Sequence, residues 1–185
     1  MTNQEVLWGL AVEQDGFVTT LDAHDAGIPV VELAKLAHRK KLRRVAQGVY
    51  RFDRWPAGRG EHYRFAVLWT GQRDAVLSHD TALDLLGLCD INPAQIHLTV
   101  PKQVRIRRAA QPEIVLHHED FVAGDLSWWE GIRCVTEFKA ITQGIQTGVP
   151  VHLVRQAIET ARARGLISTG DQHVLEGALG ARYAT

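Results

Sequence analysis

Residues 29–52 read PVVELAKLAHRKKLRRVAQGVYRF, and this stretch decides the fold that the sequence predicts. A helix is expected from Pro29 to Lys40 or Lys41, because proline is tolerated in a first helical turn and apolar residues recur at helical spacing. These apolar residues are Val30, Leu33, Ala34 and Ala37. Two β-prone runs follow at 42–45 and 49–52, and the connection Ala46-Gln47-Gly48 is typical of a hairpin. The stretch therefore predicts one helix followed by a two-stranded wing.

The residues before this stretch predict two more helices. Residues 3–14 carry apolar side chains at helical spacing, and Asp15-Gly16 is expected to end that helix. Residues 17–19 are expected to be extended, and Thr20 or Asp22 to cap a second helix that closes at Gly27. Three helices followed by a hairpin make the plan of a winged helix-turn-helix domain. We expect this domain over residues 1–56.

Charge is neutral in sum but uneven along the chain. The 185 residues carry 21 Lys and Arg against 21 Asp and Glu, which at first argues against a nucleic-acid binder. Residues 1–34 contain six acids and no Lys or Arg, whereas residues 35–60 contain nine bases and one acid. Because uneven charge bears on binding partners, the basic segment is a better guide to nucleic-acid binding than the neutral total.

The basic segment coincides with the third predicted helix and the wing. In a winged helix these two elements meet the major groove and the DNA backbone, and Lys and Arg supply the attraction to phosphates. The sequence thus predicts binding to operator DNA, with two copies expected on one operator. The predicted DNA-binding residues are Lys35, His38, Arg39, Lys40, Arg43, Arg44, Gln47 and Arg51. The alternative is a winged helix used only for protein contacts.

The remainder predicts a second domain over residues 61–185, after a linker at 54–60 that contains one proline and two glycines. Helices are expected at 61–71, 80–86, 137–146 and 151–164, with a last helix from a Ser168 cap to Gly180. Strands are expected at 96–100, 104–107, 113–117 and 132–135. The predicted fold class is α+β, an N-terminal winged helix-turn-helix followed by a mixed α+β C-terminal domain.

An ordered series of short motifs resembles the AbiEi-family antitoxins, including the mycobacterial MenA-type members. In the N-terminal part, the pattern is carried by Thr19-Thr20, Ala26-Gly27, Leu33, Leu36, Leu42, Arg44-Val45 and Gly48-Val49-Tyr50-Arg51. It continues with AVLSHDTALDLLGL at 75–88, IHLTVP at 96–101, EIVLHHEDF at 113–121 and GIRCVTEFKAI at 131–141. The resemblance covers about residues 15–165. Two positions depart from it: Lys41 stands where glycine is common, and Gln47 where arginine is common.

The resemblance implies a function that the residues alone do not. Proteins of this family are bacterial antitoxins that pair with a nucleotidyltransferase-like toxin and repress their own operon through the winged helix. The same function is therefore expected here, without enzymatic activity and without a cofactor. Two alternatives are a winged-helix regulator whose C-terminal domain dimerises or senses a ligand, and an enzyme, either a nuclease or one that modifies the toxin.

The second domain offers little catalytic chemistry. His79-Asp80 is more consistent with a helix N-terminus than with a metal phosphohydrolase, since further ligands do not follow at suitable spacing. His117 and His118 would point to opposite faces of a strand, so they are poorly placed to bind one metal ion. Glu137 and Lys139 form the E-x-K of one nuclease superfamily, but Glu137 also suits a first helical turn. We therefore predict neither a catalytic site nor a metal site.

Two groups of residues in the second domain are candidates for partner binding. Adjacent tryptophans cannot share one strand face, so one of them is expected at the surface, where tryptophan is enriched in interfaces. A basic strip without an intervening acid precedes them. The candidates are Lys102, Arg105, Arg107, Arg108, Trp128 and Trp129.

The sequence also predicts the compartment. The N-terminal residues MTNQEVLWGLAVEQDGF lack the basic and apolar regions of a secretory signal, and apolar runs are too short for a membrane span. Cys89 and Cys134 lie among apolar neighbours, as expected for reduced, buried thiols. A cytoplasmic protein without membrane contact is expected.

Overall fold

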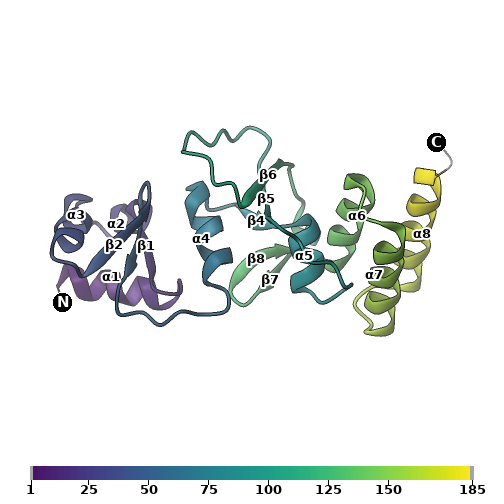
Figure 1. The fold of residues 1–185 in the computed structure, drawn as a ribbon, viewed down its shortest axis with the longest axis horizontal. Coiled ribbons are helices and arrows are strands. Elements are labelled where there is room, and N and C mark those ends of the chain that lie inside the picture. The colour runs from purple at the N-terminus through teal and green to yellow at the C-terminus, as the bar shows by residue number, and fades with distance from the viewer. Residues whose placement is uncertain (1, 184–185) are drawn as a thin grey trace. The chain divides into compact units, whose positions relative to one another are not determined.

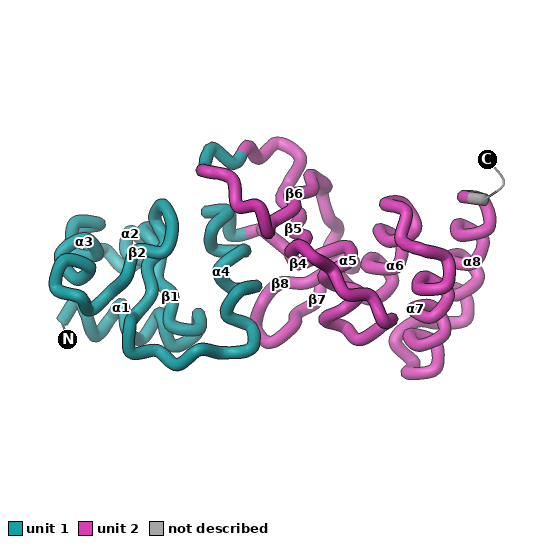
Figure 2. Tube along the Cα trace, viewed as in Figure 1, with its two compact units in different colours: residues 1–73, 106–108 teal, residues 74–105, 109–185 magenta. Residues whose placement is uncertain are grey.

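The computed structural model describes residues 2–183, and the chain divides into two compact units (Figure 2). The first unit contains the residues up to 73 together with 106–108, and the second contains 74–105 together with the residues from 109 onward. Each unit has its own β-sheet. The mixed α+β class predicted from the sequence is confirmed.

The first unit has the element order of a winged helix (Figure 1). Its elements are α1 (Asn3–Val12), β1 (Phe17–Thr19), α2 (Thr20–Asp25), α3 (Val31–His38), β2 (Leu42–Ala46), β3 (Val49–Phe52) and α4 (Glu61–Thr70). The three strands form an antiparallel sheet in the order β1-β3-β2, so the strand between α1 and α2 completes the hairpin sheet. A β-bulge lies between Arg44 and Ala46.

Local signals explain where these helices begin and end. Thr19, rather than Thr20 or Asp22, caps α2: its hydroxyl accepts from the Asp22 amide, and the Asp22 carboxylate accepts from the Thr19 amide. Helix α3 is shorter than predicted because the chain reverses at Lys40, whose φ is +55°. The Lys41 amide donates to Leu36 and the Lys40 amide to Ala37, which together form a Schellman motif.

One face of the sheet packs on helices α1 to α3 and forms the apolar core. Its fully buried side chains include Leu7, Val18 and Leu33, and Tyr50 and Phe52 reach it from β3. Alternate residues of the same strands point to the other face of the sheet. There α4 approaches, with the Phe65 ring 6.2 Å from the ring of Phe17. The first compact unit thus extends past residue 56, and the domain bounds 1–56 and 61–185 stay a prediction.

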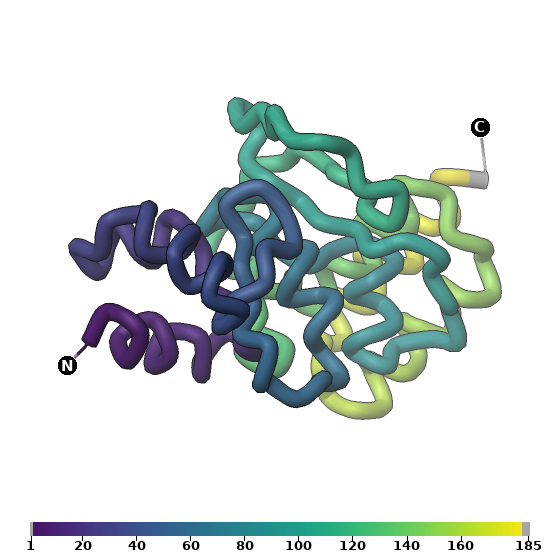
Figure 3. The backbone as a smooth tube through the Cα atoms, turned by 60° about the vertical axis from the view of Figure 1, so that its left-hand side comes forward, coloured from purple at the N-terminus to yellow at the C-terminus, as the bar shows by residue number. Residues whose placement is uncertain are grey.

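The second unit is built on a five-stranded mixed sheet in the order β6-β5-β4-β8-β7. Its strands are β4 (Val76–Leu77), β5 (Ile96–Val100), β6 (Ile114–His118), β7 (Leu126–Trp129) and β8 (Ile132–Val135). Its helices are α5 (His79–Leu85), the short η1 (Ala123–Asp125), α6 (Glu137–Thr147), α7 (Val151–Ala163) and α8 (Thr169–Tyr183). Helices α6, α7 and α8 pack on one another, and they carry the green to yellow colours in Figures 1 and 3.

The prediction of a strand at 104–107 was wrong. Strands β5 and β6 pair directly and in parallel, from Ile96 with Ile114 to Val100 with His118. Residues 101–113 are therefore the crossover between them, which parallel pairing requires to be long. The Arg105 guanidinium folds back on the carbonyls of Lys102 and Val104 instead of extending along a strand. Strand β4 was not predicted because it spans only two residues, and strand β7 was not predicted either.

Candidate nucleic-acid interface

Helix α3 shows one buried face and one exposed face. Leu33 and Leu36 are buried in the core. The exposed residues recur at positions i, i+3, i+4 and i+7, which places them in one stripe along the helix. They are Val31, Ala34, Lys35 and His38. The stripe is apolar toward the start of the helix and basic toward its end, so its two halves offer different chemistry.

A basic turn continues the stripe at the end of α3. Arg39, Lys40 and Lys41 are all exposed, and the left-handed backbone at Lys40 turns the chain toward β2. The Lys35 ammonium lies 2.6 Å from a carboxylate oxygen of Glu32, so the single acid of α3 is already paired. The net character of this end of α3 is therefore strongly cationic.

The wing adds further exposed polar side chains. Arg43 and Arg44 lie on β2, and Gln47 lies in the turn between β2 and β3. The Arg43 guanidinium is 3.6 Å from the Asp53 carboxylate, and both side chains are open to solvent. Arg44 donates to the Ala46 carbonyl at 3.4 Å. Both arginines are therefore free to exchange these weak contacts for phosphate oxygens.

We define the α3–wing surface as the exposed residues of α3, the basic turn and the wing. It contains Val31, Ala34, Lys35, His38, Arg39, Lys40, Lys41, Arg43, Arg44 and Gln47. Lys41 and the two small apolar residues were not among the predicted DNA-binding residues. The sequence placed Ala34 on the apolar stripe with Leu33, but Leu33 and Leu36 form the buried face of α3, so Val31 and Ala34 are exposed.

A hollow of about 290 Å³ adjoins the basic turn. It is lined by Gln4 and Trp8 from α1, by Lys40 and Lys41, and by Phe52 and Arg54 from the end of β3. Three cations and no carboxylate line it, a composition that suits an anionic group. The sequence did not single out Arg54, because only the fold brings it beside the basic turn.

Arg51 does not belong to the α3–wing surface, although the sequence placed it among the DNA contacts. Only 6% of the residue is exposed. Its guanidinium donates to the Glu61 carboxylate at 2.8 Å and to the Pro56 carbonyl at 3.2 Å, and it lies over the Phe17 ring. Arg51 thus connects β3 to α4, and we exclude it from the proposed contacts.

Arg108 has a partner in the wing turn. Its guanidinium donates to the Gln47 carbonyl at 2.7 Å, and burial lowers the pKa of this arginine. The predicted basic strip is divided, because Arg107 and Arg108 belong to the first compact unit and Lys102 and Arg105 to the second. The contact between Arg108 and Gln47 joins residues 61 positions apart, so no local pattern could reveal it.

Trp128 and Trp129 lie on β7, the edge strand of the second sheet. Trp128 is 64% exposed, and the Arg133 guanidinium from β8 lies 5.7 Å from its ring centre. Trp129 is partly buried on the opposite face. The expectation that one of the two tryptophans would be exposed is confirmed, and an exposed tryptophan beside an arginine suits a protein partner.

Three histidines form a partly buried cluster in the second unit, with His79 buried and His97 and His117 half-buried. The His79 ring stacks on His117 with 3.6 Å between centroids, and His97 Nδ1 lies 3.0 Å from His117 Nε2. Ser78 does not cap α5 with its hydroxyl, which instead contacts His79 Nδ1 and Thr99. Burial first, and then the neighbouring His117, His97 and Lys139 charges, lower the pKa of His79 to about 3.

The other residues of this unit that were considered for catalysis or metal binding make structural contacts. Lys139 Nζ lies 2.5 Å from a Glu119 oxygen and 3.5 Å from an Asp125 oxygen. Within the described residues, no group of three or more His, Cys, Asp or Glu side chains could hold a metal ion. Cys89 and Cys134 are both buried and free, and burial raises the pKa of Cys134 to about 12.

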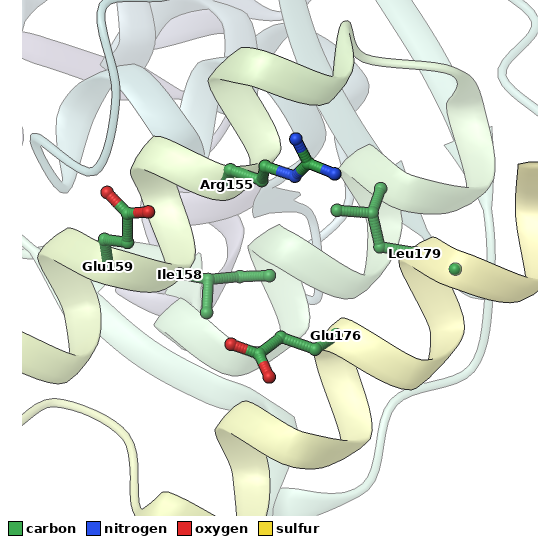
Figure 4. A pocket seen from close by; sticks show the side chains of 6 residues that line it. Arg155, Ile158, Glu159, Glu176 and Leu179 are labelled. Atoms are coloured by element: carbon green, nitrogen blue, oxygen red, sulfur yellow. The ribbon is translucent and has the colours of Figure 1, made fainter.

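A hollow of about 360 Å³ lies between α7 and α8. It is lined by Arg155, Ile158, Glu159, Glu176, Leu179 and Gly180, and in Figure 4 Arg155 extends toward Leu179 while the two carboxylates lie apart from it. These are ordinary helix-packing residues and surface charges, so the hollow adds nothing to the candidate site. Among the helices of the described part, none is both long and apolar enough to span a membrane.

The first unit is thus a winged helix-turn-helix module with a basic α3–wing surface. Residues 10–52 match a family model described as "Transcriptional regulator, AbiEi antitoxin", so this N-terminal segment is similar to that family. A solved structure, the RV2827C protein from Mycobacterium tuberculosis, is similar at 14% identity, with a TM-score of 0.48. The match covers 95% of this chain and 80% of that one. No curated protein matches the sequence.

Proposed function

We propose that this protein is a non-enzymatic, cytoplasmic antitoxin that also represses its own operon by binding DNA. The observation that carries the proposal is the α3–wing surface, where exposed cations from α3, the basic turn and β2 follow one another along a winged helix. The family description of residues 10–52 supports both roles, since it names a transcriptional regulator and an antitoxin.

The DNA-binding part of the proposal assigns a role to each element. Helix α3 enters the major groove, and Arg43, Arg44 and Gln47 of the wing follow the backbone. The hollow beside the basic turn holds a backbone phosphate between Lys40, Lys41 and Arg54. Because residues 1–60 carry a net charge of only about +2, affinity is modest and salt-sensitive, and two copies bind one operator.

The antitoxin part of the proposal uses the second unit. Trp128 and Arg133 on the β7–β8 edge form the toxin-binding patch, with Trp129 behind them. By the family resemblance, the toxin is a nucleotidyltransferase-like protein encoded next to this chain. Lys102 and Arg105 are exposed on the 101–113 crossover and offer additional contacts to an acidic partner.

One experiment tests both parts. The chain is co-expressed with the product of the neighbouring gene, and co-purification, rescue of growth and binding to the upstream DNA are scored. The proposal expects a complex, rescue and a retarded DNA band. DNA binding without any effect on the neighbouring gene product would favour a regulator whose second unit dimerises or senses a ligand.

A further inference from the structure

Two exposed valines lie at the start of α3, Val30 as its N-cap residue and Val31 as its first residue. Val30 is 47% exposed and Val31 is 54% exposed, although burying a valine side chain is favourable. Val31 shares its stripe with Ala34, one turn further along α3, and then with Lys35 and His38. Leu33 and Leu36 are buried on the opposite side and set the rotation of the helix. The small apolar pair is therefore displayed outward by the packing of α3.

We infer that Val31, supported by Ala34, selects thymine by contact with its 5-methyl group in the major groove. The inference rests on the proposed DNA-binding function. Residues near the start of a recognition helix contact base edges, and thymine alone presents a methyl group in the major groove. A β-branched side chain without hydrogen-bonding atoms can satisfy a methyl group but no donor or acceptor of the other bases.

The charges around Val31 and Ala34 indicate that nucleic acid, rather than a protein, binds this surface. The stripe continues without a break into Lys35, His38 and the basic turn. A protein partner covering Val31 would also have to neutralise these cations, whereas a DNA groove brings phosphates on both sides of its base edges. Glu32, the acid nearest to Val31, is paired with Lys35 at 2.6 Å and presents little net repulsion.

The test removes one methyl group at a time from the DNA. Duplexes are selected from a random library with the full-length protein, and each thymine of the selected site is replaced by deoxyuridine. For at least one thymine, we expect binding to weaken about fourfold, the value of one buried methyl-sized group. Val31→Ala should weaken binding to the thymine duplex to a similar extent and should abolish the further loss on deoxyuridine replacement.

Val12→Ala is the matched control, because Val12 is also an exposed helical valine of the first unit, at 51%. This variant should keep the full thymine preference. A wild-type protein that is indifferent to deoxyuridine, or a Val31→Ala variant that keeps the preference, overturns the inference while leaving DNA binding intact. Failure to select any duplex overturns the proposed DNA-binding function itself, so the two failures are distinguishable.

Discussion

The Arg51 guanidinium of β3 lies 2.8 Å from the Glu61 carboxylate of α4 and is almost wholly buried. Because these residues face each other across the outer face of the wing sheet, the pair fixes α4 to the winged helix. Arg51, which the sequence analysis predicted to contact DNA, thus connects two elements of the first unit.

Glu61→Gln should lower the free energy of unfolding by about 2 kcal/mol, since it weakens a charge-assisted hydrogen bond to a buried guanidinium. Urea denaturation of the full chain measures the change. Asp53→Asn is the matched control, because it breaks the exposed pair with Arg43 and should cost less than about 0.5 kcal/mol. Equal effects of the two substitutions would contradict a structural role for the buried pair.

Lys40→Gly should raise stability while weakening DNA binding. The residue has a φ of +55° in the Schellman turn, and relief of left-handed strain in a non-glycine residue is worth about 1 kcal/mol. Loss of the cation should reduce the salt slope of DNA binding by about one. Lys41→Gly removes the same charge without relieving strain, so it should share only the loss of affinity.

The double variant Arg39→Ala/Arg44→Ala should bind the operator more weakly, with a salt slope smaller by about two, because one phosphate contact is lost from the basic turn and one from the wing. Titration at several salt concentrations measures both quantities. Arg105→Ala removes an exposed arginine of the second unit and serves as the control. Unchanged operator affinity in the double variant would falsify the proposal that α3 binds the major groove and the wing binds the backbone.

Stability should fall as the pH drops below about 6.5. In the unfolded chain His79 has its ordinary pKa of 6.5, whereas burial and the neighbouring His117, His97 and Lys139 charges lower the folded value to about 3. The unfolded state therefore binds the proton first, and the contribution of His79 is complete above pH 6.5 and is lost toward pH 3. The pKa values of His97 and His117 are also lowered by burial and act in the same direction.

His79→Asn isolates this contribution, since asparagine tolerates the left-handed backbone at this position, where φ is +53°. Denaturation between pH 4 and 6 should show a slope smaller by up to about 1.4 kcal/mol per pH unit. Measurements at pH 7.5 give the packing cost of the substitution separately from the effect of His79 titration. A slope identical to that of the wild type at every pH would remove His79 as the titrating group.

Trp128→Ala should impair neutralisation of the toxin and spare the operator. The side chain is 64% exposed, so its removal costs little stability, whereas loss of an interface tryptophan often weakens binding about 30-fold or more. Growth rescue, co-purification and DNA binding measure the three quantities. Val122→Ala changes another exposed apolar residue, at 68%, and should leave all three unchanged. Loss of rescue together with operator binding would indicate a folding defect instead.

Periodic patterns were sufficient for the elements that bury one clear face. The third helix, the hairpin and the amphipathic helix at 151–164 were predicted from residues that repeat at the spacing of their secondary structure. The buried face of the third helix was predicted only in part, because Leu33 is buried but Val30 and Ala34 are exposed. Strand β4 spans only two residues, too few for a periodic signal. Val104–Arg107 has the composition of a strand, yet parallel pairing of β5 with β6 makes this segment their crossover.

The sequence by itself determined a winged helix with its cations concentrated on the third helix and the wing, since the spacing of apolar residues and local charge are both properties of neighbouring residues. Only the tertiary structure decided which of those cations face solvent. It buried Arg51 against Glu61, joined Arg108 to the wing turn, and brought Arg54 beside Lys40 and Lys41. These contacts depend on how separate elements pack, and no local pattern contains that information.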